Sequence, residues 1–274
     1  MATLLFYKKP ALLNRELHKT LRFKASSDYS FTEHINSVPL TGIEFFEASR
    51  DMPVLFSKDE KGDFLPLALL SLLKDGHRQL GESGSWTDTY VPAFVRRYPF
   101  ALTDDGNVCL DEEAPHFSHK EGELLFNEEG NNSETLTAIV NFLNHYDQQY
   151  KNTRAFCAAC KEQALFTPFN LQVMLGKKKP LRLEGLFAID EKKLTVLPED
   201  KVSGWFRSGW LAWSYAHLHS LGALNRLVKR QRQESPSEEE ITDEIKPLEQ
   251  PVKKTAPDAN KTEGVSSQLE EEPV

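Results

Sequence analysis

Apolar residues repeat most regularly between residues 133 and 164, in the middle of the chain. They recur at steps of three and four residues, which is the spacing of one face of an α-helix. These residues are Leu136, Ile139, Val140, Leu143, Tyr146 and Tyr150. Ser133 precedes them as a candidate N-cap. The pattern predicts a long central helix that begins after Ser133 and ends near Ala164.

Strand patterns dominate the chain before this helix. The apolar run at residues 52–56 and a second run at residues 64–73 flank the turn sequence DEKG, which predicts a β-hairpin. Residues 100–110 are strand-like around an Asp-Asp-Gly turn, and an acidic loop follows them up to residue 132. Residues 1–31 alternate loosely and carry scattered basic side chains, which is typical of edge strands or of an arm packed across the body.

A short helix is predicted among these strands. Thr41 and Glu44 form a Ser/Thr-x-x-Glu capping box, in which each side chain accepts a hydrogen bond from the backbone N–H of the other residue. The helix that it starts should run through Phe45, Phe46 and Ala48.

After the central helix, residues 168–175 and 181–189 predict two strands. The three lysines at 177–179 lie in the turn between them and are interpreted as a solvated hairpin tip rather than a phosphate contact. Residues 199–206 and 209–229 predict two helices, with tryptophans that we expect in the core. The predicted fold class is α+β: mixed strands in the N-terminal half, a long central helix, a β-hairpin and C-terminal helices, then a disordered tail.

The composition changes at residue 233. From there to residue 274 the chain has no Phe, Trp or Tyr, and it holds 12 acidic and 4 basic residues. Such a segment cannot bury enough apolar area to offset its chain entropy. We therefore expect a globular body at residues 1–232 and an acidic disordered tail at residues 233–274.

The tail also accounts for the charge of the chain. Its net charge of −8 equals the formal net charge of all 274 residues, so residues 1–232 are neutral as a whole. A neutral body lacks a strong field for nucleic acid, and no nucleic-acid partner is predicted. The first lysines follow the N-terminal apolar patch, which is not the order of a Sec signal. No apolar stretch is long enough to cross a bilayer, so we expect a cytoplasmic protein without a membrane span.

Residues 90–100, YVPAFVRRYPF, combine four aromatic side chains with two prolines and paired arginines. Pro92 suits the first turn of a helix and Pro99 would end it, so about one helical turn is predicted between them. Arg96 and Arg97 cannot both be buried without carboxylate partners, so at least one is expected to face solvent or an acidic neighbour.

Tyrosine and arginine are frequent in the hot spots of protein interfaces. The candidate interaction residues are therefore Tyr90, Arg96, Arg97 and Tyr98. A plainer interpretation is that residues 90–100 are a connecting segment whose aromatic side chains pack into the core, while one arginine forms an ion pair with the acidic loop.

The cysteines are interpreted as structural. Cys157 and Cys160 form a C-x-x-C pair, but a redox pair lies at the start of a helix, where the helix dipole lowers a thiol pKa. These two lie deep in the predicted central helix and continue its apolar face, as small buried side chains do. Cys109 stands alone, so a zinc site would lack its second cysteine pair.

The histidines give no metal site. His217 and His219 are two residues apart on a predicted helix and so point to opposite sides. His116 and His119 are interpreted as solvated side chains of the acidic loop. The common hydrolase, metalloprotease and nucleotide-binding motifs are absent from the sequence. We therefore predict no catalytic residue, no metal and no cofactor.

With residues 90–100 as its most specific part, the sequence resembles the SapC family of bacterial proteins. The other segments that carry the resemblance are LNR at 13–15, NSVPL at 36–40, RDMP at 50–53, LFN at 125–127, SGW at 208–210 and HLHSLG at 217–222. Together they extend over nearly all of residues 1–230 and leave out the acidic tail.

The resemblance implies a protein related to bacterial surface layers, and genes of the family tend to lie near genes for flavin-dependent halogenase-like proteins. We therefore expect a non-enzymatic interaction or accessory protein with a protein partner, associated with the surface layer or envelope. Non-Sec export would then take it to the cell surface. The alternative is a cytoplasmic enzyme or enzyme subunit that works with a flavin-dependent halogenase-like protein. A deep pocket lined by Arg96, Tyr98, His116 or His119 would support this alternative.

Overall fold

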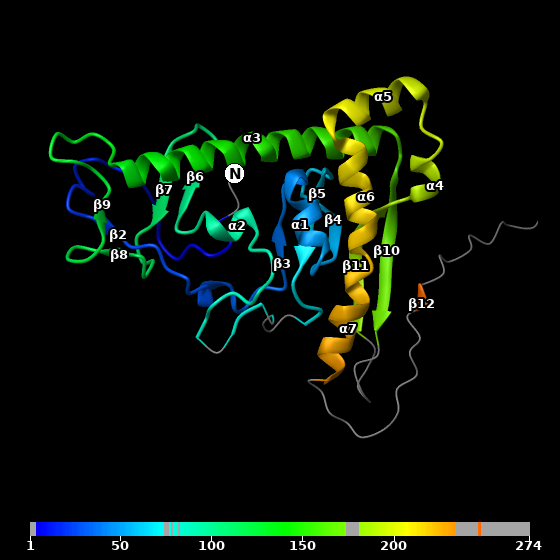
Figure 1. The fold of residues 1–274 in the computed structure, drawn as a ribbon, viewed down its shortest axis with the longest axis horizontal. Coiled ribbons are helices and arrows are strands. Elements are labelled where there is room, and N and C mark those ends of the chain that lie inside the picture. The colour runs from blue at the N-terminus through cyan, green and yellow to red at the C-terminus, as the bar shows by residue number, and fades with distance from the viewer. Residues whose placement is uncertain are drawn as a thin grey trace, which may run out of the picture.

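The computed structural model describes residues 4–73, 77, 79–81, 83–173, 181–233 and 246–247. Its fold class is α+β, as predicted, with antiparallel sheets and a long central helix, α3 (Glu134–Glu162). Figure 1 shows α3 as a bar that runs past the small sheets at one end and the large sheet at the other. Its contacts with both β5 and β6, described below, join these parts of the fold.

The predicted start of α3 is confirmed. Ser133 is its N-cap, and the Ser133 hydroxyl accepts a hydrogen bond from the backbone N–H of Leu136 at 3.1 Å. The helix has 29 residues, which corresponds to a length of about 44 Å. Such a long helix is stabilised mainly by the packing of its apolar face on other elements.

The large sheet has the strand order β12-β10-β11-β4-β5-β3. Its strands are β3 (Ser37–Pro39), β4 (Val54–Lys58), β5 (Phe64–Leu69), β10 (Phe166–Val173), β11 (Leu181–Ile189) and β12 (Lys246–Pro247). Both predicted hairpins, β4–β5 and β10–β11, are confirmed, and β11 pairs with β4 to join them. The three lysines at 177–179 lie outside the described residues.

Strand β12 was not predicted. It belongs to the segment at residues 233–274 and pairs with β10, with Lys246 opposite Gln172 and Pro247 opposite Leu171. This pairing places two residues of the segment at one edge of the large sheet.

Two small sheets form the other end of the fold. One has the order β1-β7-β6, from β1 (Pro10–Leu12), β7 (Val108–Asp111) and β6 (Phe100–Leu102). The other has the order β8-β2-β9, from β8 (Phe117–Ser118), β2 (Arg22–Phe23) and β9 (Glu123–Leu124). Edge strands or an arm were predicted for residues 1–31: β1 is an edge strand on β7, whereas β2 is the central strand of its sheet. The expected acidic loop, in contrast, contributes β8 and β9, which flank β2.

The capping box at Thr41 and Glu44 is confirmed. It begins the 3-10 helix η2 (Gly42–Glu44), which continues into α1 (Phe45–Ser49). Gly42 has to be a glycine here, because a Cβ at this position would lie 2.3 Å from the ring of Trp213. Another 3-10 helix, η1 (Ser30–Thr32), precedes β3.

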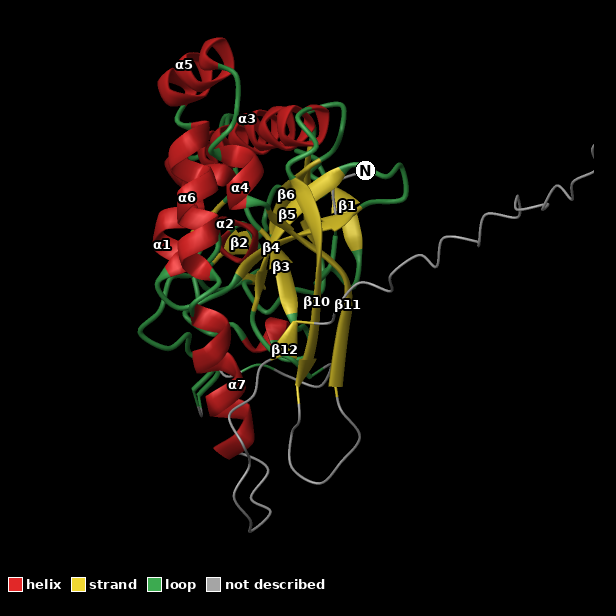
Figure 2. Cartoon of the chain, turned by 90° about the vertical axis from the view of Figure 1, so that its right-hand side faces the viewer, coloured by secondary structure: helices red, strands yellow, loops and turns green. Residues whose placement is uncertain are grey.

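The C-terminal helices are α4 (Glu191–Leu194), α5 (Glu199–Ser208), α6 (Trp210–Ser220) and α7 (Ala223–Gln233). Figure 2 shows α1, α6 and α7 stacked along one side of the large sheet. The prediction of a single helix over residues 209–229 is wrong, and α4 was not predicted. The helix ends at Ser220 because Leu221 and Gly222 donate to carbonyls three residues back, which tightens the last turn. Glycine also weakens helix continuation.

The main core lies where α1, α3, α5 and α6 meet the sheet. Trp205 and Trp213 are buried, as expected, and pack edge-on against Phe156 with ring centroids 6.2 and 5.6 Å away. Phe45 and Phe56 complete this cluster. Trp210 is partly buried against it.

His217 connects α6 to the large sheet by hydrogen bonds of its side chain. Its side chain is 0% exposed, its Nδ1 lies 2.8 Å from the Val54 carbonyl, and its Nε2 accepts from the Ile189 N–H at 3.0 Å. These contacts require a neutral ring with the proton on Nδ1. Burial lowers the pKa of His217 from 6.5 to about 4, partly opposed by the hydrogen bond to Val54. His219 is exposed, so the prediction that the two histidines point to opposite sides is confirmed.

We predict that His217 makes the fold less stable as the pH falls from 6.5 to 4. Its folded-state pKa is below its unfolded-state value, so the unfolded chain binds more protons in this window. The full loss is about 3 kcal/mol, because lowering a pKa by one changes the free energy of unfolding by about 1.4 kcal/mol. Urea unfolding of the wild type and of His217→Gln between pH 4 and pH 7.5 measures this loss of stability.

The His217→Gln curve should fall less steeply over this window than the wild-type curve. The matched control is His219→Gln, which should keep the wild-type slope because His219 is exposed. Parallel curves for wild type and His217→Gln would contradict the assignment. The buried His77 and His116 are present in all three proteins, so their contribution to the pH dependence cancels when the curves are compared.

Candidate functional site

The carboxylate of Glu44 holds the start of the segment at residues 90–100. Glu44 is 3% exposed, and its Oε2 accepts from the backbone N–H and the hydroxyl of Thr41, both at 2.8 Å. Its Oε1 accepts from the Tyr90 hydroxyl at 2.9 Å and from the Ala93 N–H at 2.6 Å. Ala93 begins the helix α2 (Ala93–Arg96), whose first N–H groups have no partner within the helix. Glu44 therefore caps two helices at once.

The carboxylate of Asp111 holds the other end of the segment. Asp111 is 0% exposed and accepts from the Tyr98 hydroxyl at 2.9 Å. It also accepts from the backbone N–H groups of Lys8 and Lys9, at 3.1 and 2.8 Å. Burial alone would raise the pKa of Asp111, but these hydrogen bonds lower it further than burial raises it, to below 3.8. A charged Asp111 thus ties the segment to the N-terminal arm.

The tyrosines at both ends of the segment act as hydrogen-bond donors. Burial and then the neighbouring Glu44 raise the pKa of Tyr90 to about 12. Burial and the hydrogen bond to Asp111 raise the pKa of Tyr98 as well. Both hydroxyls therefore stay protonated at neutral pH and donate to the two carboxylates.

The paired arginines have different surroundings. Arg96 is exposed, whereas Arg97 is 7% exposed, so the prediction that at least one faces solvent is confirmed. The Arg97 guanidinium lies 4.1 Å from the ring centroid of Phe94 and 5.2 Å from that of Tyr146. Consecutive residues of a helix point about 100° apart, so one turn of α2 sends them in different directions.

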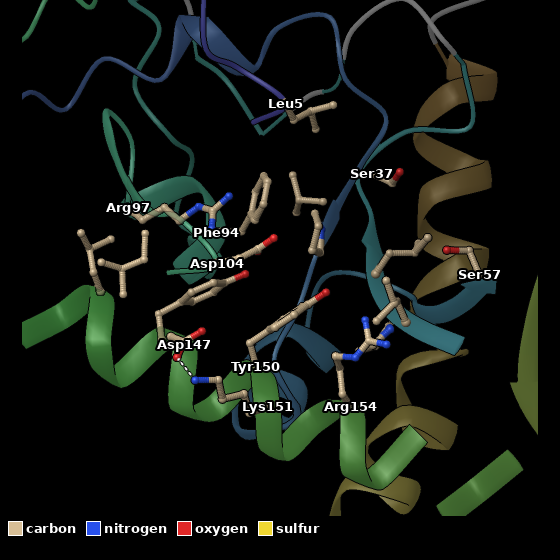
Figure 3. Close-up of a pocket in the computed structure, with 18 of the residues that line it drawn as sticks. Leu5, Ser37, Ser57, Phe94, Arg97, Asp104, Asp147, Tyr150, Lys151 and Arg154 are labelled. Atoms are coloured by element: carbon tan, nitrogen blue, oxygen red, sulfur yellow. Dashed lines mark ion pairs between the residues drawn. The ribbon is translucent and has the colours of Figure 1, made fainter. Parts of the chain in front are cut away.

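Arg97 reaches a cavity of about 1040 Å³ that lies beneath α3. Figure 3 shows Tyr150 and Arg154 projecting from α3 into this cavity, with Phe94 and Arg97 entering from α2. The α3 residues that line it extend from Leu143 to Arg154, which is about 16 Å along the helix axis. The volume is at the upper end for small-molecule sites.

The opposite wall comes from the end of the large sheet. All three residues of β3 line the cavity, together with residues 65–67 of β5, the last residue of β6 and the turn that follows it. The apolar side chains of this wall are Leu5, Ile35, Val38, Leu65, Leu67 and Leu102. The side opposite α3 thus carries most of the apolar lining, although His34, Asn36, Ser37 and Ser57 line it as well, and the charged residues Asp147, Lys151 and Arg154 lie on the α3 side.

Ion pairs lie along the α3 side of the cavity. Lys151 pairs with Asp147, with Nζ 2.7 Å from the carboxylate oxygen. Arg154 pairs with Asp63 at 3.0 Å and lies 3.8 Å from Asp59. These pairs are partly exposed, so each contributes about 0–1 kcal/mol to stability. Three cations and two carboxylates line the cavity, since Arg97 and Asp104 do so as well.

Of the four candidate interaction residues, only Arg97 lines the cavity. Tyr90 and Arg96 lie together, with the Arg96 Nη2 3.2 Å from the Tyr90 oxygen, and Tyr98 is buried against Asp111. The pocket expected for an enzyme was to be lined by Arg96, Tyr98, His116 or His119, and none of these lines it.

The polar residues of α3 that line the cavity were not predicted from the sequence. Tyr146 and Tyr150 were assigned to the apolar stripe of the central helix, although Tyr150, Lys151 and Arg154 follow one another along one side of it. The mixture of tyrosine and charge at helical spacing was the available signal.

The cysteines are structural, as interpreted. Cys157 and Cys160 are buried in α3. Burial raises the pKa of the Cys157 thiol to about 12 and also raises that of Cys160. Cys109 is buried in β7, and its pKa is also raised by burial. All three are therefore thiols at neutral pH, and a thiol is a poor nucleophile.

The interpretation of His116 as a solvated loop residue is wrong. The ring is buried and lies parallel to Phe23, with centroids 6.1 Å apart and planes at 8°. His119 is exposed, as expected, and its Nδ1 lies 3.2 Å from the Thr20 hydroxyl. Within the described ranges, no three His, Cys, Asp or Glu residues are grouped to hold a metal.

We predict that Glu44→Gln destabilises the fold by about 2–4 kcal/mol. The new NH₂ group faces donors, so two of the four hydrogen bonds are lost and buried donors remain unpaired. Urea unfolding at pH 7 measures the change. Glu47→Gln is the matched control, because Glu47 is an exposed residue of α1, the helix that follows Glu44, and should change stability by less than about 0.5 kcal/mol. Equal effects of the two changes would refute the double cap.

Comparison with known proteins gives one match. The model of the family described as SapC matches residues 13–227, which is most of the chain. No curated protein and no solved structure matches the chain. In the part of the chain that the structure describes, no helix has the length and apolar content of a membrane span.

Proposed function

The chain belongs to the SapC family, and we propose that it is a non-enzymatic interaction protein, an accessory to a surface-layer or envelope system. The observation that carries this proposal is the exposed Arg96, which is held in place before any partner binds. Its Nε donates to the Val91 carbonyl at 3.0 Å, and its Nη2 donates to the Tyr90 hydroxyl at 3.2 Å. The guanidinium also lies 5.3 Å from the ring centroid of Phe142.

We call Tyr90, Arg96 and Phe142 the arginine platform. An exposed arginine normally loses much side-chain freedom on binding, which weakens association. Here that freedom is already restricted, while the remaining N–H donors of the guanidinium point away from its two hydrogen bonds. Such a group suits a carboxylate on a protein partner, since arginine and carboxylate form paired, charge-assisted hydrogen bonds.

A second candidate is a cytoplasmic enzyme or enzyme subunit that works with a flavin-dependent halogenase-like protein. The cavity beneath α3 favours it, because the cavity brings two arginines, a lysine and two tyrosines together with an apolar wall. We place it second because the polar groups there serve binding and orientation as well as they would serve a reaction.

We predict that Arg96→Ala weakens capture of the protein partner at least tenfold. The change removes the charged donor of the arginine platform, and hot-spot arginines contribute about 2 kcal/mol or more. The measurement is quantitative co-purification of the tagged full chain from the bacterium that makes it, in parallel with a chain that lacks residues 233–274.

Arg207→Ala is the matched control, because Arg207 is an exposed arginine on α5, outside the platform. It should leave capture unchanged. Loss of capture only when residues 233–274 are removed would assign recognition to the acidic segment instead. Equal capture by wild type and Arg96→Ala would remove the platform from the proposal.

The place of the protein in the cell is a separate prediction. We expect intact protein in the cytoplasmic fraction. If the protein has a surface role, part of it should also be found in the envelope fraction or the medium, after export by a non-Sec route. Residues 233–274 would then serve as an uncleaved export signal as well as a solvating arm. Fractionation of cells with antibody detection measures this. If the protein never leaves the cytoplasmic fraction, the surface version of the proposal fails and a cytoplasmic accessory role remains.

A further inference from the structure

The hydroxyl of Tyr146 is a hydrogen-bond donor that faces the cavity beneath α3. The side chain is 8% exposed and lines the cavity. Its hydroxyl makes no hydrogen bond to another described residue and is not one of the buried polar atoms, so it is accessible to a bound molecule. Burial raises the pKa of Tyr146, so the hydroxyl keeps its proton at neutral pH. A ligand oxygen would satisfy this donor.

Tyr150 supplies a second hydroxyl one helical turn away. It lies on the same face of α3 and points into the cavity (Figure 3). Arg154 follows another turn along the helix, where its guanidinium hydrogen-bonds with Tyr150 and pairs with Asp63. The α3 side of the cavity thus presents a row of donors.

Arg97 places a positive charge next to this row, whereas Lys151 and Arg154 are already paired with carboxylates. Arg97 lies 5.2 Å from the ring centroid of Tyr146, so a positive charge is close to the first hydroxyl. Of the two carboxylates that line the cavity, Asp147 is in an ion pair with Lys151 and Asp104 lies near the β6–β7 turn. Arginine and lysine offer more donors than one carboxylate partner uses, so they can keep their ion pairs and still attract an anion.

The opposite wall requires an apolar partner. Leu65 and Leu67 of β5 are partly exposed there, as is Ile35, and Leu5 is exposed, whereas Val38 and Phe94 are already buried by their neighbours. Covering this wall removes apolar surface from water, which stabilises a bound molecule by about 25 cal/mol per Å². A small polar anion would leave it uncovered.

We propose that the cavity beneath α3 binds an amphipathic organic acid, with its carboxylate at the hydroxyls of Tyr146 and Tyr150 and its apolar body along Leu5, Ile35 and Leu65. This goes beyond the interaction role, which needs no small molecule. The arginine platform and the cavity use different side chains, so each proposal can fail without the other.

The test uses three probes with the same twelve-carbon chain: dodecanoate, dodecanol and dodecylammonium. Isothermal titration calorimetry on the full chain at pH 7.5 measures their affinities, below the concentrations at which they form micelles. We expect dodecanoate to bind at one site and at least tenfold more tightly than dodecylammonium, because a carboxylate accepts hydrogen bonds from phenols whereas an ammonium group can only donate. Dodecanol should fall between them.

Variants locate the carboxylate. Tyr146→Phe keeps the ring against Arg97 and removes only the hydroxyl, so it should weaken dodecanoate binding about tenfold or more, as loss of a hydrogen bond to a charged group does. Tyr150→Phe should weaken it too, and it carries the test if Tyr146→Phe does not fold. Tyr215→Phe is the matched control, because Tyr215 is exposed on α6, away from the cavity, and should change nothing.

Three results would overturn the proposal. One is the absence of dodecanoate binding to the wild type. Another is equal binding of dodecanoate and dodecylammonium, which would indicate apolar contact alone. The last is unchanged dodecanoate affinity in folded Tyr146→Phe and Tyr150→Phe. Partner capture by Tyr146→Phe at the wild-type level would meanwhile leave the arginine platform intact.

Discussion

Two buried carboxylates, Glu44 and Asp111, fix the segment at residues 90–100. A buried carboxylate costs several kcal/mol unless its oxygens accept hydrogen bonds, so the donors of each must be in place when the fold is complete. Glu44 takes them from the turn at Thr41 and from the start of α2, and Asp111 takes them from Tyr98 and the N-terminal arm. A helix of four residues has no stability of its own. The position of α2 therefore depends on these two acids.

This constraint decides where the paired arginines point. With α2 fixed at both ends, Arg96 is directed to solvent and Arg97 to the cavity. Each then meets an aromatic ring of α3, since Arg96 lies 5.3 Å from Phe142 and Arg97 lies 5.2 Å from Tyr146. The two adjacent arginines thus have different roles: Arg96 is placed to contact a partner, and Arg97 is placed in the interior of the fold.

Features that depend on neighbouring residues could be predicted from the sequence. The cap at Ser133, the capping box at Glu44 and the hairpin around DEKG all follow from spacing and turn chemistry. The second pair of hydrogen bonds to Glu44 could not be predicted, because its donors are about fifty residues away. The same holds for the cavity, which is formed by segments far apart in the sequence, from Leu5 to Arg154. The break after Ser220 was missed because the apolar pattern continues through it.

Helix α3 connects the arginine platform with the cavity. Phe142 and Tyr146 are four residues apart, so they lie one above the other on the same side of α3. Any movement of α2 that shifts Arg97 relative to Tyr146 must also shift Arg96 relative to Phe142, because the two arginines are adjacent in one rigid turn. The reverse does not hold, since an exposed side chain such as Arg96 can change rotamer without moving the backbone. A change at the cavity that moves α2 therefore also moves Arg96 in the arginine platform. A rearrangement of the Arg96 side chain alone leaves the cavity unchanged.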